Sequence, residues 1–334
     1  MAKRLTSNEA LIEAMSEEMR RDERVFVLGE EIVGHQGIQA YQAYTGMEKE
    51  FPERMVDVTM SELVIIGSCI GAAMTGMRPI CDILFSEFLA LIMGHLAVDA
   101  GSAYYFSAGT LTVPMVVRAR YGVGVTRGHP GDYHAWLQHI PGVKVVAPSN
   151  AYDAKGLMKS AIRDDNPVVY LDHLAICTGK RSEIPEEEYF VPIGVADVKR
   201  PGKDVTVVGF GNMVNHALTA AEELSKESID VEVVDLRTVV PFDREAIRES
   251  VRKTGVLVIA QETWKQGSTG SEIAAFVSEE LFHELKAPII RLGMPHVPFA
   301  RSLDLMKLLA PSPQNVIEGV RAALAAGSKY AQAG

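Results

Sequence analysis

The sequence predicts two α/β domains, each built around a parallel β-sheet. Short, continuously apolar segments alternate with helix-like segments, which is the pattern of parallel strands covered by helices on both faces. The alternation stops at a charged, proline-bearing stretch, GKRSEIPEEEYFVPIG at residues 179–194, and then resumes. A chain of 334 residues, 47% of them hydrophobic, is long enough for two cores. We therefore expect a first domain over residues 1–185, a linker over 186–203 and a second domain over 204–334.

The first domain is predicted to begin with a helix. Thr6 to Glu9 forms a capping-box pattern, and the helix that it opens runs to about Arg21. Apolar strands are expected at residues 25–29, 55–60, 78–84, 113–119, 143–147 and 168–171. Further helices are expected at residues 61–76, about 87–102 and 151–163. The segment 61–76 is apolar on every face, so we expect it to be buried.

The second domain repeats the alternation over a shorter length. Strands are expected at residues 205–210, 231–236, 256–260 and 288–292. Helices are expected near residues 213–225, 244–253, 271–282 and 313–325. The pair Gly209 and Gly211 resembles the start of a dinucleotide fingerprint, but Val214 stands where the third glycine is needed, so we reject NAD binding.

The composition excludes several classes of partner. The net charge is −10, from 33 basic and 43 acidic residues, which argues against nucleic acid because phosphate binding needs basic patches. The three cysteines form no CxxC pair, which fits a reduced, intracellular compartment. No apolar signal core follows the first basic residues, and no apolar run reaches the length of a membrane span. We therefore expect a cytoplasmic protein without membrane contact.

The strongest candidate for chemistry is Glu62, which follows a strand and begins a very apolar helix. Ligands of open parallel sheets bind at the carboxyl ends of strands. The helix N-terminus favours an ionised carboxylate, whereas burial favours the neutral acid. A carboxyl group held between these two influences is suited to exchanging a proton with a ligand. An acidic residue that only complements the helix dipole remains the alternative.

Small residues follow Glu62 along the same helix. Gly67 and Gly71 are four residues apart and let another backbone come close. The contact can be within the chain or with another subunit, and the apolar character of the helix favours a subunit interface.

Two other strand ends carry candidate residues. Phe85 and Phe88 follow the predicted strand 78–84 and are suited either to stacking on a planar ligand or to the core. The segment 121–134 contains Arg127, His129, Asp132 and His134, which favours acid–base chemistry over a metal site; an ordinary solvated loop is the alternative.

Ordered sequence blocks over nearly the full length resemble the beta subunit of thiamine-diphosphate-dependent 2-oxo acid dehydrogenases, a transketolase-like family that acts on pyruvate, acetoin or branched-chain 2-oxo acids. The blocks are VFVLGEEI (25–32), MSELVIIGSCIGAAMTGMRPICD (60–82), FSEF (85–88), HIPGVKVVAPSNAYDAKGLMKSAIRDDNPVVYL (139–171), PEEEYFVPIG (185–194), VVDLRTVVPFD (233–243) and SVRKTGVLVIAQE (250–262). The resemblance implies a pyrimidine-binding domain followed by a transketolase C-terminal-like domain.

The resemblance also assigns roles to three side chains. Glu62 matches the family glutamate that hydrogen-bonds a ring nitrogen of the aminopyrimidine and so promotes removal of the thiazolium proton. Phe88 matches the aromatic residue that packs on that ring. His129 matches a loop histidine that assists substrate handling or acyl transfer to a lipoyl group. Five residues match positions that hold a structural K⁺, chiefly through main-chain carbonyls: Met115, Ala161, Ile162, Asp164 and Asn166.

An absent motif implies a partner. Family enzymes hold the diphosphate through Mg²⁺ on a GDG motif, but here Gly131-Asp132 is followed by Tyr133. The resemblance therefore implies that an alpha-type subunit holds Mg²⁺ and completes the site, in an α₂β₂ heterotetramer that passes the acyl group to a lipoyl acyltransferase core.

Departures from the family pattern leave alternatives. The usual His-Ser-Gln reads His129-Pro130-Gly131, and the helix after Phe88 carries Gly94, His95 and Val98 in place of the usual polar residues. A subunit of a split transketolase-like carbon–carbon transferase is thus the second hypothesis. A non-catalytic scaffold subunit is the third, although a carboxylate in front of an apolar helix argues against it.

Overall fold

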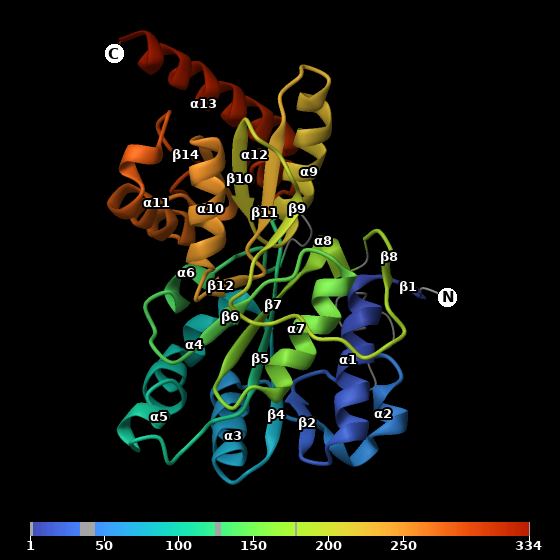
Figure 1. Cartoon of the computed structure of the whole chain (residues 1–334). Coiled ribbons are helices and arrows are strands. Elements are labelled where there is room, and N and C mark those ends of the chain that lie inside the picture. The colour runs from blue at the N-terminus through green and yellow to red at the C-terminus, as the bar shows by residue number, and fades with distance from the viewer. Residues whose placement is uncertain (1–2, 34–43, 124–127, 178, 334) are drawn as a thin grey trace. The chain divides into compact units, whose positions relative to one another are not determined.

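The chain folds into two compact α/β units. A computed structural model describes residues 3–33, 44–123, 128–177 and 179–333 (Figure 1). The first unit comprises residues 1–121 and 136–193, and the second comprises residues 122–135 and 194–334. The segment 122–135 therefore belongs to the second unit, although the expected boundary lay at 185. The stretch expected as a linker is divided between the units at 193/194.

The sheet of the first unit is parallel, with its strands in the order β6-β7-β5-β4-β2-β3. The strands are β2 (Val25–Gly29), β3 (Met55–Asp57), β4 (Arg78–Phe85), β5 (Val116–Tyr121), β6 (Lys144–Val146) and β7 (Val168–His173). One row of paired residues runs Val27, Ile80, Val116, Val168 across four strands. These branched side chains are fully buried, which explains the continuous apolar runs of the sequence.

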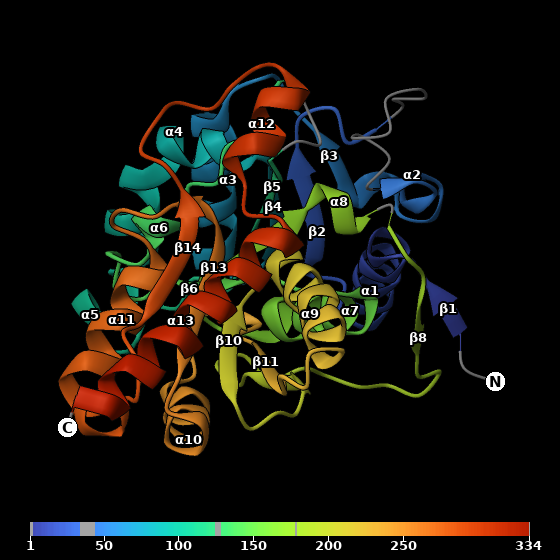
Figure 2. The same cartoon turned by 90° about the horizontal axis from the view of Figure 1, so that it is seen from above.

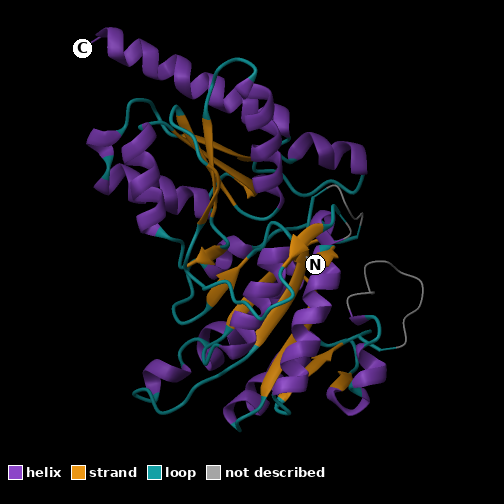
Figure 3. Cartoon of the chain, turned by 45° about the vertical axis from the view of Figure 1, so that its right-hand side comes forward, coloured by secondary structure: helices purple, strands orange, loops and turns teal. Residues whose placement is uncertain are grey.

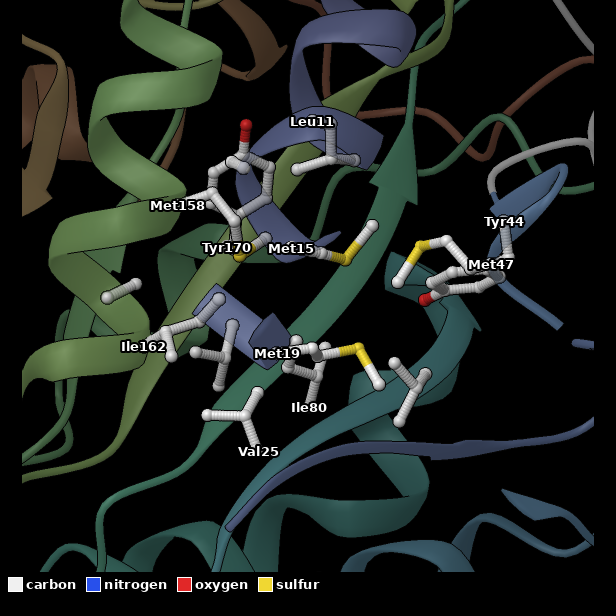
Figure 4. Packing of buried hydrophobic residues seen from close by; sticks show 14 of the residues in the cluster. Leu11, Met15, Met19, Val25, Tyr44, Met47, Ile80, Met158, Ile162 and Tyr170 are labelled. Carbon is white, nitrogen blue, oxygen red and sulfur yellow. The ribbon is translucent and has the colours of Figure 1, made fainter. Parts of the chain in front are cut away.

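Two helices cover one face of this sheet, α1 (Ser7–Arg21) and α7 (Ala151–Arg163). The Thr6 hydroxyl accepts from the backbone of Glu9, whose side chain accepts from the Thr6 backbone, so the predicted capping box is confirmed. Figure 4 shows Met15 and Met19 of α1 in the same core as Ile162 of α7. The periodicity of both helices places their apolar residues on the side of the sheet.

The opposite face carries α3 (Glu62–Met74), which packs on β4. Successive strand residues point to opposite faces. Cys81 thus faces α3, where it contacts Cys69, and both are fully buried. The expectation that α3 is buried all round is wrong for this chain, because Leu63 is 55% and Val64 49% exposed. Only one side of the helix meets the sheet, and the other side is apolar without cover from the described residues.

The remaining elements of the first unit are short. They are β1 (Lys3–Leu5), α2 (Met47–Glu50), η2 (Pro52–Arg54), η3 (Ser86–Phe88), α4 (Leu89–Gly94), η4 (His95–Ala100), α5 (Ala103–Phe106), α6 (His134–Leu137, which starts in the second unit), α8 (Leu174–Cys177) and β8 (Ser182–Ile184). The expected helix at 87–102 is interrupted, since η3, α4 and the π-helical turn η4 follow one another. β1 and β8 pair antiparallel.

The second unit has a sheet in the order β14-β13-β10-β11-β9, parallel except for the edge strand β9. Its strands are β9 (Asp197–Arg200), β10 (Val205–Gly209), β11 (Val231–Asp235), β13 (Leu257–Trp264) and β14 (Ile290–Met294), and a short strand β12 covers Thr238–Val240. Its helices are α9 (Asn212–Ser225), α10 (Arg244–Thr254), α11 (Thr269–Glu280), α12 (Leu303–Leu309) and α13 (Pro313–Ala333), with the turn η5 (Phe282–Glu284). Figures 2 and 3 show α9 beside α13, and the core of the unit lies between these helices and the strands.

None of the helices within the described residues is long and apolar enough to cross a lipid bilayer.

Candidate active site

Three strands of the first unit deliver acidic residues to one edge of the sheet. Gly29 at the end of β2 pairs with Asp57 of β3 on one side and with Asp82 of β4 on the other. Glu30 follows Gly29 directly, and Glu62 begins α3 a few residues after β3. Parallel strands end on the same edge, so the fold gathers carboxylates where a ligand of such a sheet binds.

Glu62 is half-buried at the N-terminus of α3. Its carboxyl group is close enough to Glu30 to influence it electrostatically. Burial of Glu30, and then the negative charge of Glu62, raise the pKa of Glu30 above its ordinary value. The sequence analysis did not select Glu30, although the motif Gly-Glu-Glu directly after a buried strand was the available signal.

The edge of β4 is shaped by a glycine on the neighbouring strand. A Cβ atom on Gly29 would lie 2.9 Å from both the Cβ and the carbonyl oxygen of Asp82, so only glycine permits this approach. The Asp82 carboxylate in turn accepts from the backbone N–H of Leu84 at 2.7 Å. Leu84 has φ of +61°, a strained value for a branched side chain. The kink shifts the register of pairing with β5 between Asp82 and Phe85, and η3 follows directly after Phe85.

Phe88 is the last residue of η3 and is also half-buried. Its ring meets Phe85 edge-on, with centroids 6.1 Å apart and an interplanar angle of 77°. The helix α4 continues directly from Phe88 and packs against α3. The structure therefore brings the segments of Glu62 and Phe88 together on the first unit, with a partly accessible aromatic ring beside an acidic edge.

A charged network is buried within the same sheet, on its α1 and α7 face. Arg118 is fully buried and donates to Asp82 at 2.8 Å and to Asp172 at 2.5 Å. The Tyr44 hydroxyl also donates to Asp82, and Arg120 lies 3.7 Å from Asp172. Although burial acts in the opposite direction, the charges of Arg118 and Arg120 keep the pKa of Asp172 below its ordinary value.

Sequence reasoning missed this network because its charged members are spread over three separate apolar strands. The signal was present at Asp82 in RPICDIL, at Arg118 and Arg120 in VVRARY and at Asp172 in VVYLDH. A charge inside a fully buried strand needs a partner, so three such strands side by side predict a network.

His129 and its neighbours belong to the second unit. His129 is half-buried, whereas His134 and Asp132 are completely buried. The alternative of an ordinary solvated loop is thus wrong for residues 130–132 and 134, which are buried, whereas Tyr133 is half-buried. Arg127 lies outside the described residues.

The residues assigned to a cation lie around the end of α7. The Met115 carbonyl accepts from Val168 N–H at 3.0 Å, which places it beside the loop that follows the helix. A guanidinium group donates to two of the carbonyl oxygens, since Arg78 Nη1 is 2.9 Å from Ile162 O and 3.1 Å from Asp164 O.

The loop itself is closed by hydrogen bonds among the same residues. Asp164 N–H donates to Ala161 O at 3.3 Å, and Asn166 N–H donates to the Asp164 carboxylate at 2.9 Å. The five predicted residues therefore lie in one neighbourhood that already attracts a positive charge.

Comparison with known sequence families identifies both units. Residues 3–173 match "Transketolase, pyrimidine binding domain", and residues 194–316 match "Transketolase, C-terminal domain". The predicted order of the two α/β domains is confirmed.

Curated proteins with similar sequences are beta subunits of dehydrogenases. The pyruvate dehydrogenase E1 component subunit beta of Rhizobium meliloti is 42% identical over 322 residues, covering 95% of this chain and 69% of the relative. The 2-oxoisovalerate dehydrogenase subunit beta of Bacillus subtilis is 45% identical over 291 residues, covering 85% of this chain and 88% of the relative. The mitochondrial pyruvate dehydrogenase E1 subunit beta of Caenorhabditis elegans is 40% identical, covering 97% and 93%.

Solved structures agree on the fold. A split-gene transketolase, described as an inactive beta4 tetramer, superposes with a TM-score of 0.80 at 25% identity, covering 97% of this chain and 99% of that chain. Transketolase from Pichia stipitis gives a TM-score of 0.65 at 15% identity, covering 97% of this chain and 46% of that chain.

Proposed function

This chain belongs to the family of transketolase-like E1 beta subunits of 2-oxo acid dehydrogenases, and from that premise we propose how its own residues serve the oxidative decarboxylation of a 2-oxo acid. It is a subunit of an oxidoreductase of the thiamine-diphosphate-dependent class. The proposed substrate is pyruvate, an acetoin-type substrate or a branched-chain 2-oxo acid, and the acyl group passes to a lipoyl acyltransferase.

The observation that carries the proposal is the position of Glu62. It is a half-buried carboxyl group at the start of an apolar helix, next to the buried carboxyl group of Glu30. The proposed role of Glu62 is to hold a proton on the ring nitrogen of an aminopyrimidine. The protonated carboxylic acid is the form able to donate that proton.

Thiamine diphosphate, when bound, supplies the nucleophilic carbon and the electron sink for decarboxylation. The residues of this edge fit its pyrimidine end, because Phe88 offers a partly accessible ring for a planar group and Glu62 a carboxyl group for a ring nitrogen.

The same edge is unsuited to a diphosphate. Glu30 is under the influence of four other acidic residues, Glu62, Glu31, Asp82 and Asp57. Asp82 is paired with Arg118, and the remaining carboxyl groups of Glu31, Asp57 and Glu62 disfavour a phosphate group. We therefore propose that an alpha-type subunit supplies the Mg²⁺ and the diphosphate site, and that the two chains form an α₂β₂ assembly.

The exposed face of α3 is evidence for the proposed contact with a partner chain. Leu63 and Val64 are half exposed beside Glu62, and apart from the adjoining residues and backbone of α3 itself no heavy atom of the described residues lies within 4 Å of a Cβ placed on Gly67 or Gly71. The small residues thus permit a close approach that the chain itself does not use. An apolar face that starts at the acidic edge fits a subunit that completes the site.

We also propose functions for His129 and for the five residues assigned to a cation. His129 assists substrate handling or acyl transfer to the lipoyl group. The main-chain carbonyls of Met115, Ala161, Ile162, Asp164 and Asn166 fit a structural K⁺, because a carbonyl oxygen that already accepts from Arg78 has a second lone pair. A melting temperature that rises in KCl but not in choline chloride supports the K⁺ site, and equal values in the two salts oppose it.

The proposed location is the cytoplasm, which is consistent with three buried cysteines that form no disulfide.

A second candidate function is favoured by one specific finding. The split-gene transketolase covers almost the whole chain with a TM-score of 0.80. A subunit of a two-chain carbon–carbon transferase would use the same acidic edge. The higher identity to dehydrogenase beta subunits, 42% and 45% against 25%, favours the dehydrogenase.

Co-expression with an alpha-type chain tests the proposal. The assembled protein is assayed with thiamine diphosphate, Mg²⁺, a panel of 2-oxo acids and an artificial electron acceptor. We expect decarboxylation of one class of 2-oxo acid, and weak cofactor binding by this chain alone in calorimetry. Ketol transfer between sugar phosphates without oxidative decarboxylation would instead establish the transferase. Tight cofactor binding by the isolated chain would refute the shared site.

A further inference from the structure

The segment that carries His129 is attached to the second unit on both sides of that residue. Arg301 donates to the carbonyl of Gly128, directly before His129. The hydroxyl of Thr263 donates to the carbonyl of Asp132 at 3.1 Å, three residues after it. The backbone around His129 therefore has fixed contacts with β13 and with the loop before α12.

A buried set of three polar side chains forms the end of this attachment. His134 Nδ1 lies 2.6 Å from Asp132 Oδ1, and His134 Nε2 lies 3.0 Å from the Thr269 hydroxyl at the start of α11. Asp132 and His134 have no exposed surface and Thr269 is 1% exposed. The rings of Phe210 and His134 meet in a T-shaped contact, with centroids 4.9 Å apart and an interplanar angle of 79°.

The hydrogen bonds of these three side chains run in one direction, from the Thr269 hydroxyl through His134 to the Asp132 carboxylate. Nδ1 of His134 faces a carboxylate oxygen of Asp132, so the tautomer that satisfies this contact has its proton on Nδ1 and donates it to Asp132. Nε2 then accepts, and the Thr269 hydroxyl donates to it. The backbone N–H of His134 also donates to Asp132 Oδ1, at 3.1 Å. The other carboxylate oxygen, Oδ2, is buried without a hydrogen-bond partner among the described residues, so His134 is the residue that orients the Asp132 carboxylate in this part of the structure.

The order Asp–His–Thr is also that of a nucleophilic triad. The hydroxyl of such a triad must reach a substrate. Thr269 is almost completely buried and faces the His134 ring. A positioning role is therefore the chemistry that the geometry allows.

We infer that Asp132, His134 and Thr269 are positioning residues that fix the segment bearing His129 on the second unit. The inference rests on the proposed role of His129 in acyl transfer. Pro130, Gly131 and Asp132 are buried while His129 itself is half-buried, so the buried part of the segment begins immediately after His129. A side chain that handles a substrate must be held to within about 0.5 Å, and a buried, directional set of hydrogen bonds supplies that restraint.

Thr269→Val tests the attachment with little change of shape. It removes the hydroxyl that donates to His134 and keeps the volume of the side chain. Thr219→Val is the matched control, because that threonine is exposed on α9 and donates only to the Asn215 carbonyl at 3.0 Å. Thr269→Ser, which restores a hydroxyl, is the rescue variant.

Hydrogen exchange of the assembled protein is the first measurement. In Thr269→Val we expect faster exchange of the backbone amides within residues 128–135, with the rest of the chain unchanged. Thr219→Val and Thr269→Ser should exchange there like the unmodified chain. Unchanged exchange of residues 128–135 in Thr269→Val would overturn the inference, whatever the activity of His129.

Acylation of a lipoyl domain is the second measurement. We expect Thr269→Val to lower kcat of the transfer by about 10- to 100-fold, the usual cost of misplacing a reacting group, with the KM for the 2-oxo acid unchanged. In the His129→Ala background, Thr269→Val should cause no further loss. An equal loss in both backgrounds would overturn the positioning role. Normal transfer by His129→Ala alone would refute the proposed role of His129 and leave the attachment to the exchange measurement.

Discussion

Gly67→Leu separates the stability of the chain from its assembly. Gly67 lies inside α3, and apart from the adjoining residues and backbone of that helix no heavy atom of the described residues comes within 4 Å of a Cβ placed there. In a helix interior leucine is more favourable than glycine by about 0.7 kcal/mol. That gain raises the melting temperature of a domain of this size by about 2 °C. The isolated chain should therefore be as stable as before, or slightly more stable.

Gly67→Leu should weaken assembly with the partner chain, although it does not lower the stability of the isolated chain. If a partner backbone packs on this glycine, the leucine side chain overfills the contact at a cost of about 1–3 kcal/mol, or roughly a 10- to 100-fold weaker association. Differential scanning calorimetry of the isolated chain and sedimentation of the co-expressed complex measure the two effects. Thr219→Leu, an added leucine on the exposed side of α9, is the control and should assemble normally. Normal assembly of Gly67→Leu at micromolar concentration would refute the placement of the partner on α3.

Three further predictions concern buried or paired charges. Arg118→Met leaves Asp172 without its closest cation and should cost about 3–5 kcal/mol of unfolding free energy in urea; a loss below about 1 kcal/mol would contradict the network. Burial and neighbouring carboxylates raise the pKa of Glu30, so its ionisation destabilises the fold above its ordinary pKa of 4.5. Glu30→Gln should therefore melt higher than the unmodified chain at pH 7 and lose that advantage as the pH falls below about 4.5; a lower melting temperature at pH 7 would speak against it. A side-chain hydrogen bond from Arg24 lowers the pKa of Asp22 from 3.8 to about 2, so the stabilisation is complete above 3.8 and disappears as the pH falls through 2. Asp22→Asn should show a smaller drop in melting temperature between pH 4 and pH 2, and an unchanged drop would exclude this pair.

Local signals predicted much of the first unit. The capping box at Thr6 and Glu9 fixed the start of α1, and the residues of α7 and β2 were predicted with the bounds that the structure has. These elements are set by neighbouring residues and by apolar periodicity, which a single sequence contains. Strand ends were less accurate, since β3 ends at Asp57 and β5 begins at Val116. Pairing with neighbouring strands determines these ends, and apolar runs do not report it.

Long-range contacts account for what the sequence did not predict. The exposure of Leu63 follows from which side of α3 meets the sheet, and an apolar helix gives no sign of that side. The contacts of residues 128–134 with the second unit come from Thr263, Thr269 and Arg301, which lie more than 125 residues later. In the candidate site, too, local signals were predicted and long-range contacts were not. Glu62 and Phe88 were selected from strand ends and from resemblance, whereas Glu30 became a candidate only when β2 was placed between β3 and β4.

The most direct measurement of the central claim is single-turnover decarboxylation by the assembled enzyme in which Glu62 is changed to Gln. Glutamine keeps the size of the side chain but does not exchange a proton with a ring nitrogen. We predict unchanged assembly and cofactor binding, with a rate lower by about 10²- to 10⁴-fold. A rate within a factor of two of the unmodified enzyme, at saturating cofactor, would show that the chemistry proceeds without this carboxyl group.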